Sequence, residues 1–192
     1  MEPLGDATGL QPPAWAGNVL GPDAKEAVIT REVPSSRALY QVRSITAASG
    51  RLALLSVIAP NMSKKTAQEK QQTAHDVYEL LHMLLTEGGW ECPVRFWNFF
   101  PQIVDPSGLE IDGKMQHNYM MYCAGRSYAM EEYFGSYAHL GRLVCTATGI
   151  GNDFCDTFSV HMFAFERGVQ VENPRQVRCL FSSLSVRSRR RD

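Results

Sequence analysis

The sequence has 192 residues, of which 44% are hydrophobic and 20% are charged, a composition typical of a globular protein with one well-packed domain. Its formal net charge of −1 provides no positive field to attract nucleic acid or an anionic membrane surface, so we expect neither as a partner. Five scattered cysteines without a Cys-x-x-Cys pair, and no apolar run long enough to span a bilayer, favour a cytoplasmic protein with reduced thiols.

The N-terminal segment differs in composition from the rest of the chain. Residues 1–28 contain four prolines and four glycines, which interrupt any regular element and predict a loose arm. Two runs rich in Val, Ile, Leu and Tyr follow, at 37–46 and 51–59. The short turn at Gly50 between them predicts a β-hairpin.

The clearest helix is predicted over residues 63–87. Ser63 is a suitable N-cap, and Gly88 and Gly89 are expected to end the helix. Hydrophobic side chains recur at helical spacing and make one apolar stripe, which contains Ala74, Val77, Tyr78, Leu81, Leu84 and Leu85.

The remaining elements complete an α+β pattern. An aromatic strand, a second helix and three more strands are expected at 93–100, 115–134, 142–148, 154–166 and 176–182. Gly149-Ile150-Gly151 is interpreted as a turn between two of these strands. The order predicts a mixed β-sheet with the two main helices packed on one face. We place the domain at 29–184 and a basic tail at 185–192, expected to be solvated, with contact to phosphate or RNA as the alternative.

The histidines do not predict a metal site. His75 and His82 are seven apart on the first helix and can share a face, but no third ligand is spaced to join them. The sequence also contains no P-loop, nucleophile elbow or dinucleotide fingerprint. We therefore expect neither a metal nor an organic cofactor.

Four motifs occur in order along the second half of the chain: Val94-Arg95-Phe96-Trp97-Asn98-Phe99-Phe100-Pro101, Tyr119-x-x-x-Cys123-x-Gly125-Arg126, Thr146-Ala147-Thr148-Gly149 and Glu172-Asn173-Pro174-Arg175-Gln176-Val177. In these motifs the chain resembles the chorismatase family, whose members join two YjgF-like (Rid-superfamily) halves in one polypeptide. The resemblance covers only the N-terminal half of such a protein. It implies a single YjgF-like domain with a chorismate-mutase-like fold.

The resemblance assigns Tyr119 and Arg126 to substrate binding, because chorismatases use a Tyr and an Arg at this spacing. Seven helical steps bring both side chains to one face, about 10 Å apart along the helix axis. The planar guanidinium can donate two parallel hydrogen bonds to a carboxylate. From the residues alone, an Arg126 paired with a nearby Asp or Glu is the alternative. Gly125 inside the same helix predicts that another part of the molecule lies close to the helix backbone there.

Two further residues are candidates for ligand contact. Rid-superfamily deaminases hold a substrate carboxylate with a strand Arg, to which Arg142 is similar in position, and a solvent-exposed strand end is the alternative. Asn98 lies among aromatic residues and predicts either a polar contact in a ligand pocket or a cap for the adjoining loop. The catalytic acid stays unassigned, with Glu166, Glu131 and Cys145 as candidates, although a buried structural thiol is the default for Cys145.

The resemblance implies a cofactor-free enzyme that acts on a small cyclic or unsaturated carboxylate in a biosynthetic pathway, by hydrolysis, hydration or dehydration, or imine or enol-ether chemistry. In chorismatases the catalytic acid lies in the second half, and this sequence ends soon after Gln176, so we expect that half to be missing. The alternative is a non-catalytic ligand-binding or partner-subunit module that keeps the carboxylate contact without the acid. Because YjgF-like domains commonly form trimers with ligand clefts between subunits, we expect a homotrimer or pairing with a second YjgF-like subunit.

Overall fold

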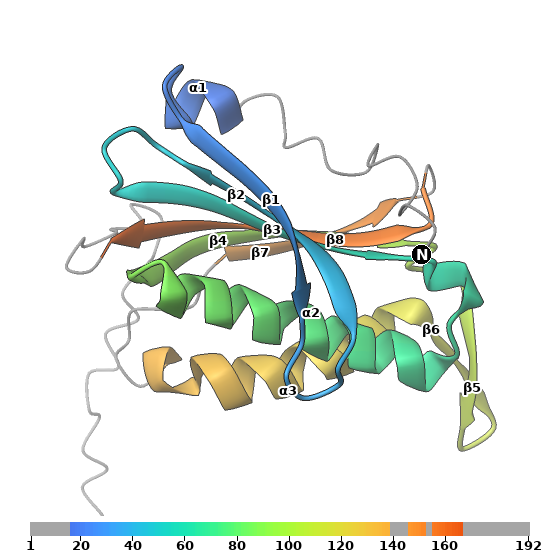
Figure 1. The fold of residues 1–192 in the computed structure, drawn as a ribbon. Helices are drawn as coiled ribbons and strands as arrows, with labels where there is room; N and C mark the ends of the chain where they lie inside the picture. Colours follow the sequence, from blue (N-terminus) through green and yellow to red (C-terminus); the bar gives the residue numbers. More distant parts are fainter. Residues whose placement is uncertain (1–15, 139–145, 153–154, 167–192) are drawn as a thin grey trace, which may run out of the picture.

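The structure is a computed structural model that describes residues 16–138, 146–152 and 155–166 (Figure 1). The helices are α1 (Ala16–Leu20), α2 (Ala67–Glu87) and α3 (Asn118–Ala138), with a 3-10 turn at Met62–Lys64. The strands are β1 (Lys25–Glu32), β2 (Leu39–Thr46), β3 (Leu52–Pro60), β4 (Trp90–Pro101), β5 (Pro106–Ile111), β6 (Lys114–His117), β7 (Thr146–Asn152) and β8 (Thr157–Glu166).

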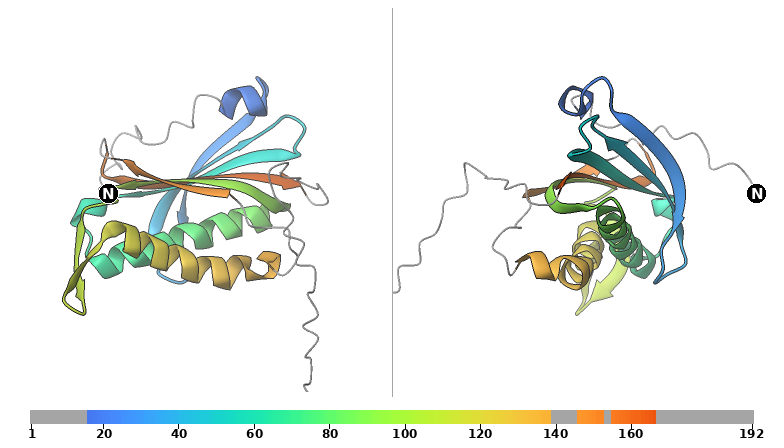
Figure 2. Two further views of the ribbon diagram at one scale, coloured as in Figure 1. Left: turned by 180° about the vertical axis from the view of Figure 1, so that it is seen from behind. Right: turned by 60° about the vertical axis from the view of Figure 1, so that its left-hand side comes forward.

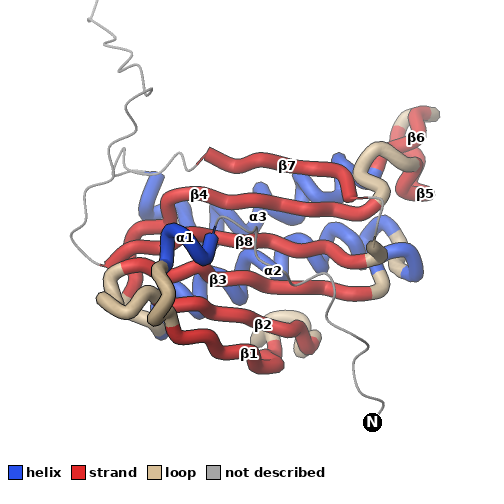
Figure 3. The backbone as a smooth tube through the Cα atoms, turned by 90° about the horizontal axis from the view of Figure 1, so that it is seen from above, coloured by secondary structure: helices blue, strands red, loops and turns tan. Residues whose placement is uncertain are grey.

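Six strands form one mixed sheet in the order β1-β2-β3-β8-β4-β7, and β5 and β6 form a separate hairpin. Neighbouring strands run antiparallel except β4 and β7, which are parallel. Both long helices lie side by side on one face of this sheet (Figure 2), and the view onto the other face shows them beneath the strands (Figure 3). The predicted α+β architecture, with two main helices on one face of a mixed sheet, is confirmed.

The main core lies between the helices and the sheet. Alternate side chains of the three central strands point into this layer, as β-strand geometry requires. The buried strand residues are Leu55, Val57, Phe96, Phe100, Phe158, Val160 and Met162. The predicted stripe of the first helix is confirmed, since all six of its members are buried. On the other face, Leu54 and Phe163 make a smaller cluster with Leu20 of α1.

A capping box begins α2 and corrects the predicted N-cap. The hydroxyl of Thr66 accepts the backbone N–H of Glu69, and the Glu69 carboxylate accepts the backbone N–H of Thr66. This reciprocal pair satisfies two of the backbone donors that every helix start leaves open. Ser63 instead donates its hydroxyl to Asp156, at 2.7 Å, and does not cap the helix. The predicted end is confirmed, because Gly88 is the C-cap and Gly89 has a φ of 71°.

Other elements differ from the expectation. The strand β1 starts at Lys25, inside the segment predicted as an arm, and pairs along its whole length with β2. The hairpin β5–β6 was not expected, and α3 begins after it at Asn118. Gly149-Ile150-Gly151 lies within β7 and is not a turn, because parallel pairing with β4 supplies its backbone hydrogen bonds. The predicted strand at 176–182 lies outside the described residues. No helix in the described part of the chain combines the length and the apolar character that crossing a bilayer requires.

The two long helices meet at Gly125, which confirms the predicted close approach. A Cβ atom at Gly125 would lie 2.1 Å from the backbone oxygen of Gln71 and 2.8 Å from the Cβ of Ala74, both on α2. Neither atom can move without shifting the helix backbone. The missing side chain therefore sets the distance between α2 and α3.

We expect Gly125→Ala to lower the free energy of unfolding by about 2 kcal/mol, because the added methyl overpacks the contact between the helices. Gly135→Ala is the matched control on the same helix, since a Cβ there meets nothing of the described residues within 4 Å. It should leave stability unchanged or raise it by up to about 1 kcal/mol through helix propensity. Chemical denaturation measures both, and equal effects of the two substitutions would contradict the assigned contact.

A polar row crosses the sheet face away from the long helices. Arg43, Ser56 and His161 are register partners on β2, β3 and β8, and His161 Nδ1 lies 2.8 Å from the Ser56 hydroxyl. The His161 ring is 2% exposed and stands edge-on to Phe99. Burial, and secondarily the charge of Arg43, lower the pKa of His161 from 6.5 to about 4.

The pKa of His161 is lower in the folded protein than in the unfolded chain. As the pH falls from 6.5 toward 4, the unfolded chain therefore binds a proton on His161 before the folded protein does, and the stability that His161 contributes above pH 6.5 is lost. This contribution amounts to about 3 kcal/mol between pH values of about 7.5 and about 4. Denaturation across this range should show a steeper loss of stability in the wild type than in His161→Gln. The control His117→Gln changes an exposed histidine and should show the same loss of stability with falling pH as the wild type. Parallel plots of stability against pH for the wild type and His161→Gln would refute the assignment.

Candidate functional site

Tyr119 and Arg126 lie on one face of α3, as their spacing predicts. Cys123 stands between them on this face, and its hydrogen bond with Tyr119 raises the pKa of the phenol. The Tyr119 side chain is half exposed, and its ring lies 6.3 Å from the ring of Tyr122, which is buried. The face therefore runs from solvent at Tyr119 into the layer between helices and sheet.

A chain of hydrogen bonds fixes the guanidinium of Arg126. Its Nε donates to the Tyr78 hydroxyl at 3.1 Å, and that hydroxyl donates to Oδ1 of Asn98 at 2.7 Å. The amide nitrogen of Asn98 then donates to the carbonyl oxygen of Thr148 at 3.2 Å. The chain joins α3, α2, β4 and β7 across the core layer. It holds one edge of the guanidinium in place through a residue, Tyr78, that is fully buried.

The side chains around Arg126 in the described part of the chain include two uncharged phenols. Burial raises the pKa of Tyr78, and burial followed by the neighbouring Tyr78 raises the pKa of Tyr122, so both phenols are neutral at physiological pH. The guanidinium also lies over the Tyr78 ring, 5.8 Å from its centroid. Among the described residues, no carboxylate approaches Arg126 within 4.0 Å. The alternative of a structural arginine paired with Asp or Glu thus finds no partner in the described part of the chain.

This arrangement suits a carboxylate ligand. A partly buried cation without a counterion is unfavourable, and an anion that arrives from solvent would compensate it. Among the described residues, the hydrogen bond of Arg126 to Tyr78 uses only Nε, which leaves its two terminal nitrogens for a bidentate contact.

Asn98 is placed deep in the layer, with 1% of its surface exposed. Its amide oxygen accepts from Tyr78 and its amide nitrogen donates to Thr148, so both ends of the amide are engaged with the protein. The structure therefore shows Asn98 as a support for the Arg126 site. Direct contact of Asn98 with a ligand stays a prediction.

The candidate acids do not converge on Arg126. Glu131 is exposed on α3, and Glu166 lies at the end of β8, where Nε of Arg51 contacts its carboxylate at 2.5 Å. Val160 is the β8 partner of Asn98, so Glu166, six residues further along the strand, is about 20 Å from that point. The remaining predicted residues, Arg142 and Cys145, lie outside the described residues. The described residues thus assign no general acid.

Sequence reasoning missed Tyr78 and Tyr122 as members of the site. Tyr78 was interpreted only as part of the apolar stripe of α2, and its ring does pack against Phe96 in the core. The signal was the phenol itself, because a buried Tyr hydroxyl usually has a hydrogen-bond partner. The partner could not be named until the two helices were placed side by side.

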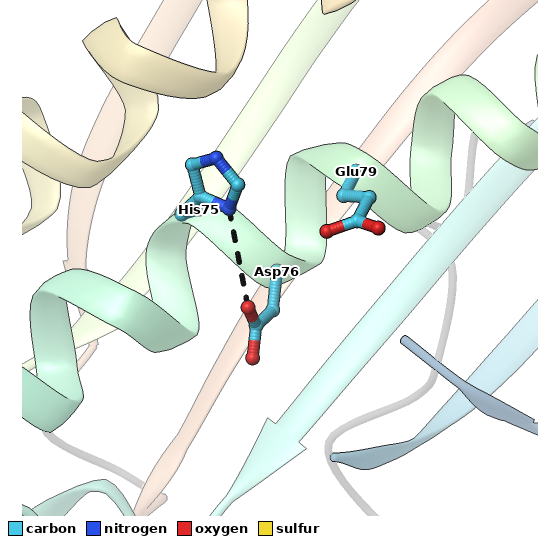
Figure 4. A group of neighbouring side chains, drawn as sticks. All are labelled: His75, Asp76 and Glu79. Atoms are coloured by element: carbon cyan, nitrogen blue, oxygen red, sulfur yellow. Dashed lines mark ion pairs between the residues drawn. The ribbon is translucent and has the colours of Figure 1, made fainter. Parts of the chain in front are cut away.

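One group of metal-ligand side chains occurs in the part of the chain that the structure describes. It consists of His75, Asp76 and Glu79 on α2 (Figure 4) and does not include Arg126 or Tyr119.

Comparison with known proteins places this architecture in a family. A family model described as "Chorismatase FkbO/Hyg5-like, N-terminal" matches residues 33–164, a range that contains Tyr78, Asn98 and Arg126. A chorismatase solved as a crystal structure at 1.08 Angstrom resolution matches with a TM-score of 0.50 and 17% identity, and at this identity the match shows the fold alone. The match covers 73% of this chain and 35% of the chorismatase chain, so the sequence spans about a third of that relative.

No curated protein matches the chain. The family model covers more than half of the sequence, and it includes β2, β3, β4 and β7, most of β8, both long helices and the hydrogen-bond chain to Arg126. The protein therefore belongs to the family described as chorismatase FkbO/Hyg5-like, N-terminal.

Proposed function

We propose that this protein is a chorismatase-like enzyme that acts, without an organic cofactor, on a small cyclic or unsaturated carboxylate in a cytoplasmic biosynthetic pathway. The observation that carries the proposal is the guanidinium of Arg126, which Tyr78 anchors and which no carboxylate of the described residues reaches. A binding site for an anionic metabolite needs a fixed cation whose terminal nitrogens stay available, and the contact with Tyr78 supports this geometry.

In this proposal Arg126 binds the substrate carboxylate with its terminal nitrogens. Tyr119 lies two helical turns away on the same face, about 10 Å along the axis, a span that fits a small ring between the two side chains. The half-exposed phenol of Tyr119 would orient the ring at the open end of the site. The chemistry would be hydrolysis, hydration or dehydration, or imine or enol-ether cleavage, with Rid-like reactions included.

The general acid would come from a neighbouring subunit. We propose a single YjgF-like domain that forms a homotrimer or pairs with a second YjgF-like subunit. The edge strand β7 supports this, because it borders the Asn98 and Thr148 end of the site and exposes Ile150. On α3, Met120 and Tyr128 are also exposed. An approaching subunit at β7 would cover Ile150 and complete the site.

Arg126→Ala should lower kcat/KM about 10- to 100-fold, because a charge-assisted contact to the substrate carboxylate is lost. The measurement is incubation of the purified protein with chorismate, with chromatography of pyruvate and the ring product, followed by related cyclic acids if chorismate is inert. Arg51→Gln changes an exposed arginine in the turn before β3, where it contacts Glu166, and as the control it should retain wild-type kinetics.

Unchanged kinetics in a folded Arg126→Ala protein would refute the assignment of Arg126. Binding of chorismate without turnover, lost in Arg126→Ala, would support the carboxylate contact and contradict the enzymatic part of the proposal.

The proposed assembly predicts that sedimentation equilibrium gives a mass three times that of one chain. Ile150→Lys should shift the mass toward the monomer, because a charge on the exposed edge strand opposes burial against a neighbour. Gly135→Ala should leave the mass unchanged. A monomeric wild-type protein at every concentration tested, with full activity, would show that the site needs no second subunit.

A further inference from the structure

Three ligand-type side chains converge on α2, on the side where the β1–β2 loop crosses the helix. His75, Asp76 and Glu79 each offer one ligand atom, and these atoms all lie within 4.8 Å of one another. Figure 4 shows the imidazole directed at the Asp76 carboxylate, with Glu79 one turn further along the helix. The group combines a nitrogen donor with two carboxylates, which is a ligand set that zinc and similar ions take.

His75 is held in an orientation that leaves Nδ1 directed inward. Its Nε2 lies 3.2 Å from the carboxylate of Glu132, an exposed residue of α3, and its ring stands edge-on to Tyr133. A carboxylate that accepts the N–H of one ring nitrogen leaves the other nitrogen with a free lone pair, as in histidines that bind metals. Nδ1 is buried, has no hydrogen-bond partner among the residues that the structure describes, and lies 4.0 Å from Oδ1 of Asp76.

The two carboxylates are buried, and their described neighbours include no Lys or Arg in ion-pair contact. Asp76 is 1% exposed and Glu79 is 5% exposed, and among the described residues no Lys or Arg reaches either within 4.0 Å. Their hydrogen-bond donors are uncharged and come from Ser35, Ser36, Tyr40 and Gln72. Burial and then the charge of Asp76 raise the pKa of Tyr40, so this phenol donates a proton and carries no charge. A cation placed between two buried carboxylates would be stabilised by both of them.

We propose that His75, Asp76 and Glu79 bind one divalent transition-metal ion of the Zn²⁺ class. Such an ion lies about 2.0–2.2 Å from nitrogen and oxygen ligands, which puts two tetrahedral ligands roughly 3.4 Å apart. The 4.0 Å between Nδ1 and Oδ1 is longer than a direct hydrogen bond, and bound metal would draw the two atoms together by about 0.6 Å.

The ion would tie three parts of the fold together. Its ligands are on α2, Glu132 of α3 holds the histidine, and Ser35 and Ser36 of the β1–β2 loop hold the carboxylates. The hydroxyl donors stay in place as outer contacts, a role that usually orients metal ligands. The ion is separate from the guanidinium of Arg126 and takes no part in the proposed reaction. The spacing of the histidines did not predict this site, because two of its three ligands are carboxylates.

The test is titration of chelator-treated full-length protein with Zn²⁺ or Co²⁺ alone, by calorimetry and by the visible spectrum of bound Co²⁺. We expect one site with a Co²⁺ spectrum that lacks a thiolate-to-cobalt charge-transfer band. His75→Ala should weaken binding at least 100-fold, and Glu132→Gln should weaken it about 10- to 100-fold through loss of the outer contact. His82→Ala is the matched control, because His82 stacks on the same Tyr133 from the same helix, and it should keep wild-type affinity.

Glu132 is exposed, so Glu132→Gln keeps the test decisive if a buried substitution impairs folding. Absence of stoichiometric binding to the wild type would overturn the proposal, as would equal affinities of wild type, His75→Ala and Glu132→Gln. A Co²⁺ spectrum with a thiolate band would assign the ion to cysteines and overturn it as well.

Discussion

The close contact of α2 and α3 at Gly125 is the constraint on which the rest of this structure depends. Because Gly125 has no side chain, the α3 backbone lies directly against Gln71 and Ala74 of α2. Two cross-helix contacts require this short distance. One is the hydrogen bond from Arg126 to Tyr78, and the other is the contact between His75 and Glu132. A helix pair separated by one more methyl group would break both, since hydrogen bonds weaken steeply beyond their normal length.

The polar chain from Arg126 to Thr148 is unusual for its position in an aromatic core. Tyr78 packs on Phe96, and Phe96 packs on Phe134, yet the Tyr78 hydroxyl is bonded on both sides. Unpaired polar groups in such a layer are costly, whereas a fully bonded chain fixes one arrangement of the elements that contribute to it. Here it links a guanidinium, through Tyr78 and Asn98, to the edge strand β7. In the proposed function, the same bonds that orient the core present this cation to the substrate carboxylate.

Local patterns predicted much of the fold. The spacing of apolar residues on α2, the hairpin around Gly50 and the aromatic strand β4 were all visible in the sequence, because helix and strand periodicity act over a few residues. The errors occurred where partners are distant in sequence. Gly149 and Gly151 are typical of a turn, but the pairing of β7 with β4 makes them part of an edge strand. Ser63 is a good local cap, but Asp156 binds its hydroxyl and Thr66 has Glu69 at the right spacing to replace it.

The sequence by itself determined the family, the α+β class, the shared face of Tyr119 and Arg126, and the need for a glycine at position 125. These follow from motif order, helical period and the conformational cost of glycine, all of which are local properties. Only the tertiary structure decided what each polar side chain contacts. Tyr78 and Asn98 are 20 residues apart, and His75 and Glu132 are 57 apart, yet each pair is in contact. Such contacts depend on how the helices and the sheet pack in three dimensions, and the spacing of residues along the chain does not reveal which distant side chains will meet.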